Sequence, residues 1–243
     1  MLPQTAGYDR AVTVFGPDGR LYQVEYALET VRRGRSAVGL KVQEGVVLAA
    51  EETRRPLQNP NVSDKVFVVD DHVAAVASGY IPDARVQVDH ARWVAQTNRL
   101  IYDEPVEVET VAKRIADLCQ QFTQFGGVRP FGVSMIIGGV DKNGPALYQT
   151  DPSGTYLNFE AVAIGEGAER VTEYLQQKFR PDMKLEEAMQ LAVECIYLVS
   201  SEKTPFIKMV TIRTEDAKVT RVSDAVIEAL AQKAREVVKE RGK

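Results

Sequence analysis

Apolar positions recur along the chain in two ways, one typical of helices and one typical of strands. Near the N-terminus, one apolar stripe follows a 3.6-residue repeat and is made of Leu21, Val24, Leu28 and Val31. This spacing predicts an amphipathic helix that buries one face. Further along, short runs rich in valine, isoleucine and alanine are separated by turn residues, which is typical of paired strands.

The predicted N-terminal helix has recognisable ends. Residues 17–19, Pro-Asp-Gly, supply turn chemistry before it. Arg32 and Arg33 suit the negative end of the helix dipole, and Gly34 is expected to close the helix in the left-handed conformation. An N-terminal helix packed on its own domain would carry the same signals.

The next part of the chain has the pattern of two hairpins followed by two helices. Expected strands cover residues 35–42, 46–51, 65–70 and 72–78, and expected helices cover residues 83–102 and 106–125. The polar stretch 52–64 contains two prolines and is expected to form a loop.

The remaining residues repeat this order. Three strands are expected at 131–140, 146–151 and 155–165, two helices at 168–179 and 185–199, and two strands at 207–213 and 218–222. A last helix is predicted to be capped by Ser223 and to bury Ile227, Leu230, Ala234 and Val237.

This order of elements predicts the fold class α+β. Strands that arrive in hairpins favour antiparallel sheets, and helices that arrive in pairs favour helical layers outside those sheets. A four-layer α/β/β/α sandwich satisfies both conditions, although other α+β arrangements fit the periodicity as well. No internal linker or low-complexity segment interrupts the chain.

Composition narrows the function classes. The chain has 243 residues, 44% of them hydrophobic, which is enough for a full core. Its 30 basic and 34 acidic residues are mixed along the sequence, so no basic block favours nucleic acid or an anionic membrane as partner. Because neither a signal peptide nor a membrane span is recognisable, we expect a cytoplasmic protein.

Cysteine, histidine and glycine patterns give no catalytic or metal site. Cys119 and Cys195 fall on apolar helix faces, which predicts buried free thiols. His72 is expected in a strand and His90 on a helix surface, and nothing clusters with either, so we expect no metal and no cofactor. Neither a G-x-S-x-G elbow nor an H-E-x-x-H motif occurs, and GEG at 165–167 is interpreted as a plain turn.

One stretch carries a family resemblance. YDR at residues 8–10, FGPDGRL at 15–21 and QVEYA at 23–27 precede a helix that ends in glycine, and their order and spacing resemble the N-terminal signature of archaeal-type proteasome α-subunits. The element order of the rest is similar to the same family. The resemblance implies the sandwich fold of N-terminal-nucleophile hydrolases, with a gate segment and ring-interface helix over residues 1–34 and a sandwich domain over 35–243.

The resemblance also implies function and partners. Identical α-subunits would form a seven-membered ring that caps proteolytic β-subunits, admits unfolded polypeptide and docks an ATPase or other activator through its C-terminal tails. In β-subunits the nucleophile is an N-terminal threonine whose own amine acts as base. Arg35 stands at the matching position and cannot attack a carbonyl. Glu51 and Lys65 match the supporting acid and lysine, and we interpret Glu51 as a carboxylate at a solvated strand end.

A second hypothesis is a self-processing amidohydrolase. Removal of residues 1–34 or 1–35 would leave a terminal nucleophile, for which Ser36 is the candidate. Such removal would discard a well-built helix and the most specific motif of the chain. The non-catalytic subunit is therefore favoured, and an intact-mass measurement separates the two hypotheses.

Individual roles follow from the resemblance alone. The gate and its open-state cluster would comprise Tyr8, Asp9, Arg10, Pro17 and Tyr26, with local turn packing as the alternative. The helix stripe Leu21, Val24, Leu28 and Val31 would face a neighbouring subunit.

Two further sites are implied in the same way. Lys65 and Gly79 would line a pocket for the activator's C-terminal carboxylate, although Tyr80-Ile81-Pro82 and the 52–64 loop depart from the usual family residues. A lysine that opens a strand is otherwise simply a solvated charge. The loop Arg129, Pro130, Phe131 and Gly132 would lie near the pore mouth, with a helix-to-strand turn as the alternative.

Overall fold

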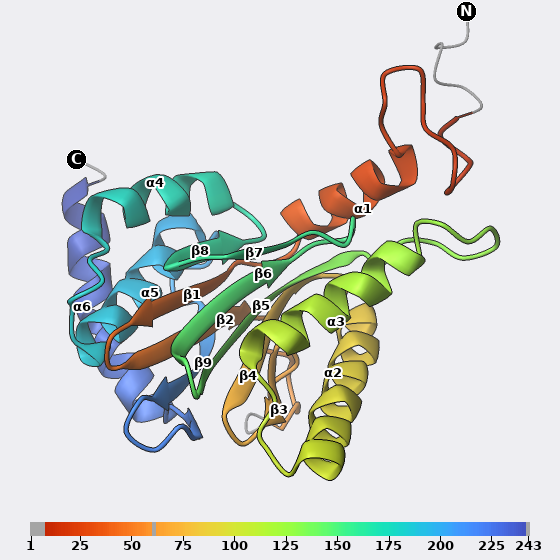
Figure 1. Cartoon of the computed structure of the whole chain (residues 1–243). Coiled ribbons are helices and arrows are strands. Elements are labelled where there is room, and N and C mark those ends of the chain that lie inside the picture. The colour runs from red at the N-terminus through yellow and green to blue at the C-terminus, as the bar shows by residue number, and fades with distance from the viewer. Residues whose placement is uncertain (1–7, 60–61, 242–243) are drawn as a thin grey trace, which may run out of the picture.

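The chain folds into four layers, as seen in a computed structural model that describes residues 8–59 and 62–241 (Figure 1). Residues 1–7 of the expected gate segment and residues 60–61 of the 52–64 loop lie outside the described residues. The helices are α1 (Tyr22–Arg32), α2 (Ile81–Tyr102), α3 (Val108–Gln121), α4 (Ala168–Lys178), α5 (Leu185–Val199) and α6 (Asp224–Arg241). The strands of the first half are β1 (Ala37–Val42), β2 (Gly45–Glu52), β3 (Val66–Asp70) and β4 (Val73–Gly79). Those of the second half are β5 (Val133–Asp141), β6 (Gly144–Thr150), β7 (Tyr156–Asn158), β8 (Ala161–Ile164), β9 (Phe206–Arg213) and β10 (Val219–Arg221).

Two antiparallel sheets form the inner layers. One sheet has the order β10-β9-β2-β1-β8 and the other has the order β3-β4-β5-β6-β7. Helices α2 and α3 cover the outer face of the second sheet, and α4, α5 and α6 cover the outer face of the first (Figure 1). The α+β sandwich expected from the order of elements is confirmed.

Apolar side chains fill three separate layers between these elements. One cluster lies between the first sheet and α4–α6, another between the second sheet and α2–α3, and a third between the two sheets. Strand β2 is buried along its whole length because both of its faces are covered. This burial on both faces explains why Val46 to Ala50 form an unbroken apolar run.

The prediction of one strand over residues 155–165 is wrong, because the chain changes sheets in the middle of that range. Strand β7 pairs with β6 in one sheet, whereas β8 pairs with β1 in the other. The transfer takes place over two residues. The amide of Phe159 still donates to Leu147 O (2.9 Å), and the carbonyl of Glu160 already accepts from Lys41 N (2.7 Å).

Several predicted helix boundaries also shift. Helix α2 begins at Ile81 instead of 83, with Pro82 in its first turn, where the missing proline N–H leaves no helical hydrogen bond unmade. Helix α3 covers Val108–Gln121 and is shorter than the predicted 106–125, because the following residues form turns. The cap of α6 is confirmed, since Ser223 Oγ accepts from Val226 N (3.4 Å).

Gly34 has a different role from the predicted left-handed helix end. It is absent from the described glycines with positive φ, so the expected conformation is wrong. A Cβ at this position would lie 2.4 Å from Gly79 N and 2.5 Å from Ser78 Oγ. The glycine therefore allows the end of α1 to approach the end of β4 closely.

Candidate functional site

A buried polar cluster occupies the place where β1 begins. The guanidinium of Arg35 donates to Glu51 Oε1 (2.6 Å) and to Glu202 Oε1 (2.7 Å), and Ser200 Oγ also donates to Glu51 Oε1 (2.9 Å). Burial lowers the pKa of Arg35, but Glu202 and Glu51 more than offset this and hold it above its ordinary value. Glu51 is only 3% exposed, so its interpretation as a solvated strand-end carboxylate is wrong.

Lys65 lies beneath this cluster and is 5% exposed. Its ammonium donates to three main-chain carbonyls, Arg35 O (2.6 Å), Glu51 O (2.9 Å) and Ser36 O (3.4 Å). Burial lowers the pKa of Lys65 to about 7, although the nearby carboxylates of Glu51 and Glu52 raise it in part. All three donors of the ammonium are therefore engaged inside the chain, joining the starts of β1 and β3 to the end of β2.

Ser36, the nucleophile of the second hypothesis, is buried. Its hydroxyl donates to Glu166 O (2.5 Å) and its own carbonyl accepts from Glu51 N (2.9 Å). A hydroxyl that donates to a carbonyl has no base to receive its proton. The geometry of Ser36 is that of a residue that fixes the start of β1.

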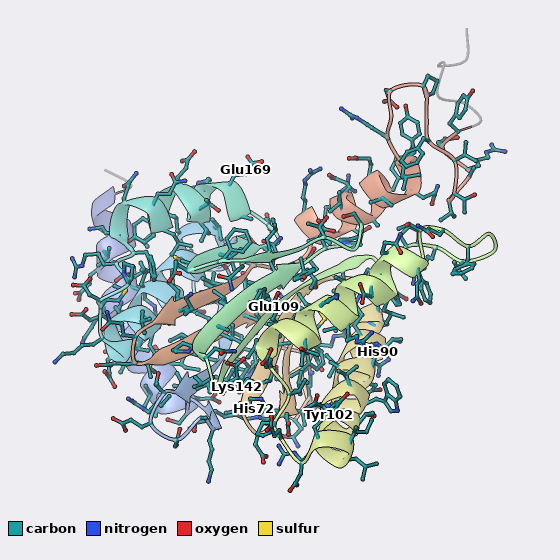
Figure 2. The ribbon with its side chains drawn as sticks, in the orientation of Figure 1. His72, His90, Tyr102, Glu109, Lys142 and Glu169 are labelled. Atoms are coloured by element: carbon teal, nitrogen blue, oxygen red, sulfur yellow. The ribbon has the colours of Figure 1, made fainter. Side chains whose placement is uncertain are left out.

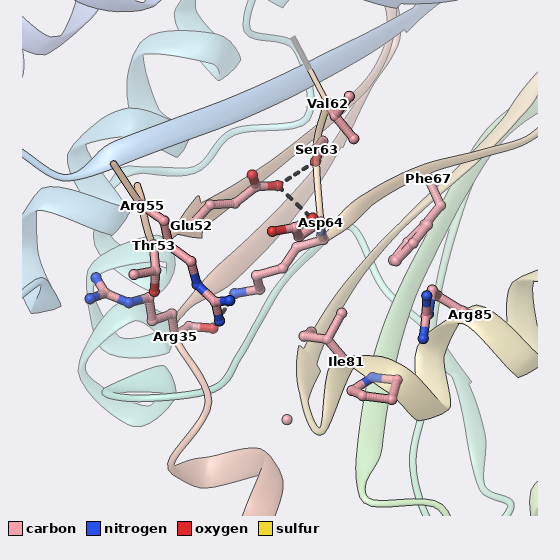
Figure 3. Close-up of a pocket in the computed structure, with 13 residues that line it drawn as sticks. Arg35, Glu52, Thr53, Arg55, Val62, Ser63, Asp64, Phe67, Ile81 and Arg85 are labelled. Atoms are coloured by element: carbon pink, nitrogen blue, oxygen red, sulfur yellow. Dashed lines mark hydrogen bonds between the residues drawn. The ribbon is translucent and has the colours of Figure 1, made fainter. Parts of the chain in front are cut away.

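A pocket opens beside Lys65, between the loop that follows β2 and the start of α2 (Figure 3). Strand ends β3 and β4 contribute Lys65 and Gly79 to its wall. Gly79 has φ +117°, and a Cβ there would lie 2.3 Å from Gly132 O, so the strand end requires glycine. The two residues predicted to share a pocket are thus brought together at the open end of the β3–β4 hairpin, where β3 begins and β4 ends.

The loop before β5 is fastened to the start of α2. Arg129 donates to both oxygens of Asp83 (2.6 and 2.8 Å), and Gly132 N donates to the same carboxylate (2.9 Å). The Arg129 guanidinium also lies 5.4 Å from the centre of the Tyr80 ring. The hydrogen bonds that Arg129 donates to Asp83 raise the pKa of Arg129 above its ordinary value.

The same loop is anchored in the core at its apolar residues. Phe131 is buried, and its ring centre lies 4.4 Å from that of Phe122; Pro130 is buried as well. Arg129 is exposed apart from its contacts with Asp83 and Tyr80. The rest of the α3–β5 loop extends from the sandwich on the same side as α1 (Figure 1).

Helix α1 presents two different faces. Val24 and Val31 are buried against the chain's own second sheet, so the prediction that they face a neighbouring subunit is wrong. Leu21 and Leu28 are half-buried, and Tyr26 is 54% exposed. The face suited to contact another molecule therefore runs through Tyr26 and not through the middle of the apolar stripe.

The segment before α1 is ordered by its own hydrogen bonds. Gly16 N donates to Arg20 O (2.8 Å), Gly19 N donates to Gly16 O (2.9 Å), and Tyr22 Oη donates to Asp18 Oδ2 (3.0 Å). These bonds close the turn that contains Pro17. Pro17, Tyr8 and Arg10 are exposed, and Asp9 is half-buried, with its carbonyl accepting from Gln23 Nε2 of α1.

The cysteines and histidines occupy structural positions. Cys119 and Cys195 are buried free thiols, as predicted, and burial raises the pKa of Cys119 to about 12. His72 lies in the β3–β4 turn instead of a strand, where its Nε2 is 2.7 Å from Val106 O. Figure 2 shows it well away from His90, which lies half-buried on α2 and stacks on Trp93.

The described ranges contain neither a metal-binding group nor a helix suited to a bilayer. Within residues 8–59 and 62–241, no three or more His, Cys, Asp or Glu side chains are grouped so that they could hold a metal ion. In the same part of the chain, none of the helices combines the length and apolar character that a bilayer span requires.

Sequence reasoning missed three members of the site. Glu202 and Ser200 are far from Arg35 in sequence, and Asp83 had no recognised role. A buried arginine needs carboxylate partners, so an acidic partner of Arg35 could be expected but not identified from the sequence. Asp83 could have been noticed as the acidic residue in the first turn of the predicted helix. Its partner Arg129, however, lies 46 positions away in the sequence.

Comparison with known proteins gives consistent matches. A family model described as "Proteasome subunit" matches residues 31–213, and a model of the N-terminal signature of A-type proteasome subunits matches residues 8–29. The proteasome alpha subunit of Archaeoglobus fulgidus is 46% identical over 242 residues, covering 98% of both chains. That of Thermococcus sibiricus is 46% identical over 97% of this chain and 92% of its own. The proteasome alpha 1 subunit of Haloferax volcanii is 44% identical over 93% of this chain and 91% of its own.

Proposed function

The chain belongs to the proteasome α-subunit family, and from this premise we propose that it is a non-catalytic subunit of the cytoplasmic 20S core particle. Seven copies form the outer ring, which gates the entry of unfolded polypeptide and docks an activator. The observation that carries the proposal is the ordered segment before α1. Its closed turn at Pro17 and its exposed Tyr8 stand beyond the sandwich, next to a helix that presents Tyr26 outward.

The absence of catalysis is proposed from the contacts of Arg35. An N-terminal nucleophile needs a free terminus and a small reactive side chain at this position. Here the chain continues into α1, and the guanidinium fills the space between Glu51 and Glu202. This arrangement supports a subunit that organises the particle and leaves peptide hydrolysis to its β-subunits.

Neighbouring α-subunits are proposed to meet at α1. A shallow pocket lies between α1 and the loop before β5, lined by Gln23, Tyr26, Ala27, Thr30, Tyr80, Arg129, Pro130 and Gly132. Its walls combine aromatic rings, a guanidinium and small side chains, which suits a contact with an exposed segment of a second copy. Leu21 and Leu28 are half-buried and would be covered further in the ring.

The β-subunits are proposed to bind the layer formed by α2 and α3. Helix α2 exposes several large apolar side chains in the single chain, namely Val86, Trp93, Leu100, Ile101 and Tyr102. Patches of this kind mark interaction surfaces in globular domains. Trp93, Ile101 and Tyr102 also line one shallow pocket between the two helices, together with polar side chains of α3.

Assembly and activity of the pure chain test the main proposal. Negative-stain images should contain rings with sevenfold symmetry, and the same sample should not hydrolyse fluorogenic peptides. Intact mass should equal that of the full sequence. Turnover by a preparation free of β-subunits, together with a mass loss of 34 or 35 residues, would establish the Ser36 hypothesis instead.

Gating has a separate test in the assembled particle. Deletion of residues 2–12 removes Tyr8 and Asp9 but leaves the Pro17 turn and α1 in place, so assembly with β-subunits should survive. Hydrolysis of a small peptide should then become fast without an activator. The number of active sites in the β-subunits, counted with a covalent inhibitor, provides the control. An unchanged rate at equal active-site number would contradict the gate.

A further inference from the structure

The turn at residues 8–11 presents one main-chain carbonyl to α1. Ala11 N donates to Tyr8 O (3.4 Å), which closes the turn with Asp9 and Arg10 at its centre. A carbonyl at the centre of a four-residue turn has no partner within that turn and needs one from elsewhere. The carbonyl of Asp9 accepts from Gln23 Nε2, in the first turn of α1. One helix side chain therefore holds a turn that lies 14 positions earlier in the chain.

Helix geometry explains why a residue at this position reaches the turn. Side chains of a helix lean toward its N-terminus, so one in the first turn extends over the chain that enters the helix. Gln23 is the second residue of α1 and is half-buried. Its side chain adds an amide donor at the end of a two-carbon stem, which an apolar side chain at the same place would lack.

The residue before Gln23 fastens a second point of the same segment. Tyr22 Oη donates to Asp18 Oδ2 (3.0 Å). Gly16 lies so close to the Tyr22 ring that a Cβ at this glycine would be 2.6 Å from Tyr22 Cε2. The turn that contains Pro17 is thus tied to the start of α1 through contacts of its own.

The residues between these two fastened points are less closely held. Thr13, Val14 and Phe15 are exposed, the last two by 44% and 65%. Without the bond from Gln23, the nearest fastened residue of the described chain is Gly16. The chain ahead of the fastened residue then lengthens from about 8 to about 15 residues, and the span of such a chain when fully extended grows from about 28 Å to about 52 Å.

From these contacts we propose that Gln23 is a latch that sets how far the gate segment reaches, the latch being its hydrogen bond to Asp9 O. With the latch closed, the segment is held beside α1 and obstructs the entrance less. With the latch open, a segment of nearly twice the length covers more of the entrance and excludes polypeptide more effectively. The latch acts within one chain, unlike a contact of Tyr8 or Tyr26 with a neighbouring copy. The inference rests on the proposed gate and names the side chain that regulates it.

Trypsin reports on the latch itself, in α-rings without β-subunits. Arg10 is exposed directly after the latched carbonyl, and cleavage after it requires the turn to leave α1. Gln23→Met keeps the side-chain length and removes the donor, so the product that begins at Ala11 should form about three- to tenfold faster by intact mass. Gln176→Met, an exposed glutamine of α4, is the matched control and should not change this rate. Equal rates for Gln23→Met and the unmodified chain overturn the latch.

Peptide entry reports on what the latch does in the assembled particle. With β-subunits present, Gln23→Met should hydrolyse a small fluorogenic peptide more slowly than the unmodified chain, by up to the same factor. The rates are compared at equal numbers of active sites, counted with a covalent inhibitor. A rate that stays the same or rises overturns the proposal.

Deletion of residues 2–12 shows whether the effect passes through Asp9. The deletion removes the accepting carbonyl, so Gln23→Met added to it should leave the rate of the deletion variant unchanged. Slowing of the same size in both backgrounds would mean that Gln23 supports the ring, and the latch would be wrong.

The deletion alone separates this inference from the gate on which it rests. If the deletion does not accelerate peptide entry, the proposed gate itself fails. If the deletion accelerates entry while Gln23→Met has no effect in the intact chain, the gate holds and only the latch is refuted.

Discussion

Arg35 Nη1 lies 2.6 Å from Glu51 Oε1, and this ion pair joins the residue that precedes Ser36 and β1 to the end of β2. The Glu51 side chain is 4% exposed and that of Arg35 is 29% exposed, so the carboxylate depends on the guanidinium for its charge balance. Ser200 Oγ provides a second hydrogen bond to the same oxygen. The guanidinium and the hydroxyl together hold this buried carboxylate in place.

Replacing Arg35 by methionine should therefore destabilise the chain. Glu51 would be left as a buried carboxylate with no cation of its own, which costs about 2–4 kcal/mol. For a chain of this size the unfolding temperature should fall by roughly 5–15 °C at neutral pH. Scanning fluorimetry at fixed protein concentration measures this change. The double variant Arg35→Met with Glu51→Gln should recover most of the lost unfolding temperature. If the single variant Arg35→Met and the double variant unfold at the same temperature, Arg35 and Glu51 do not stabilise each other.

Lys65 should give stability a distinct dependence on pH. Its folded-state pKa of about 7 is below its ordinary value of 10.5. Between these values the unfolded chain holds the proton and the folded chain has released it, so stability rises with pH by up to about 1.4 kcal/mol per unit. The contribution is complete above pH 10.5 and is lost as pH falls to about 7.

The variant Lys65→Met lacks this dependence. The unfolding temperatures of the two proteins, measured between pH 7 and pH 9.5, should therefore diverge. As pH rises, the unfolding temperature of the unmodified chain should increase relative to that of the variant. Lys233→Met, an exposed lysine of α6, controls for the removal of a positive charge. A difference in unfolding temperature that stays constant, or that shifts in favour of the variant as pH rises, would contradict the lowered pKa of Lys65.

The Asp83 carboxylate should control the order of the loop before β5. It accepts two hydrogen bonds from Arg129 and one from Gly132 N, and an asparagine has one acceptor oxygen in place of two. Because Arg129 is largely exposed, Asp83→Asn should cost only about 1–2 kcal/mol. Amide exchange at Gly132 should accelerate by about tenfold or more. Unchanged protection at Gly132 would mean that the packing of Phe131 on Phe122 alone holds the loop.

Much of the fold could be predicted because its signals are local. The hairpin turns and the 3.6-residue stripes lie within a few residues of the elements they define, as with Ser223 and the helix that it caps. The change of sheet at Phe159 and Glu160 could not be predicted, since no glycine or proline marks it. The apolar run that follows also reads as a continuation of the same strand.

The site was less accessible to sequence reasoning. A lysine at the start of a strand is usually solvated. Lys65 can be buried because its ammonium donates hydrogen bonds to three main-chain carbonyls, one from β2 and two from the residues before β1. Similarly, Glu202 comes beside Arg35 only because α5 ends next to the first sheet, 167 positions later in the chain. Long-range contacts of this kind leave no periodic signal.

Helix α1 permits a prediction that separates folding from assembly, because neighbouring positions face different surroundings. Val24 is 5% exposed and packs on the chain's own sheet, whereas Tyr26 is 54% exposed. Val24→Asp would bury a charge without a partner, which costs several kcal/mol, so the chain should melt far below its usual temperature or fail to fold.

Tyr26→Ala should have the opposite profile. Removing an exposed ring leaves the core intact, so the far-UV spectrum and amide protection of the sheets should be preserved. If the exposed face of α1 meets a neighbouring subunit in the ring, the lost aromatic contact should shift the chain toward monomers in native mass spectrometry. Tyr102→Ala, an exposed tyrosine at the end of α2, is the matched control and should leave the α-ring intact. Rings that persist in Tyr26→Ala at the lowest measurable concentration would place the subunit contact elsewhere, and the role of α1 would be confined to its own domain.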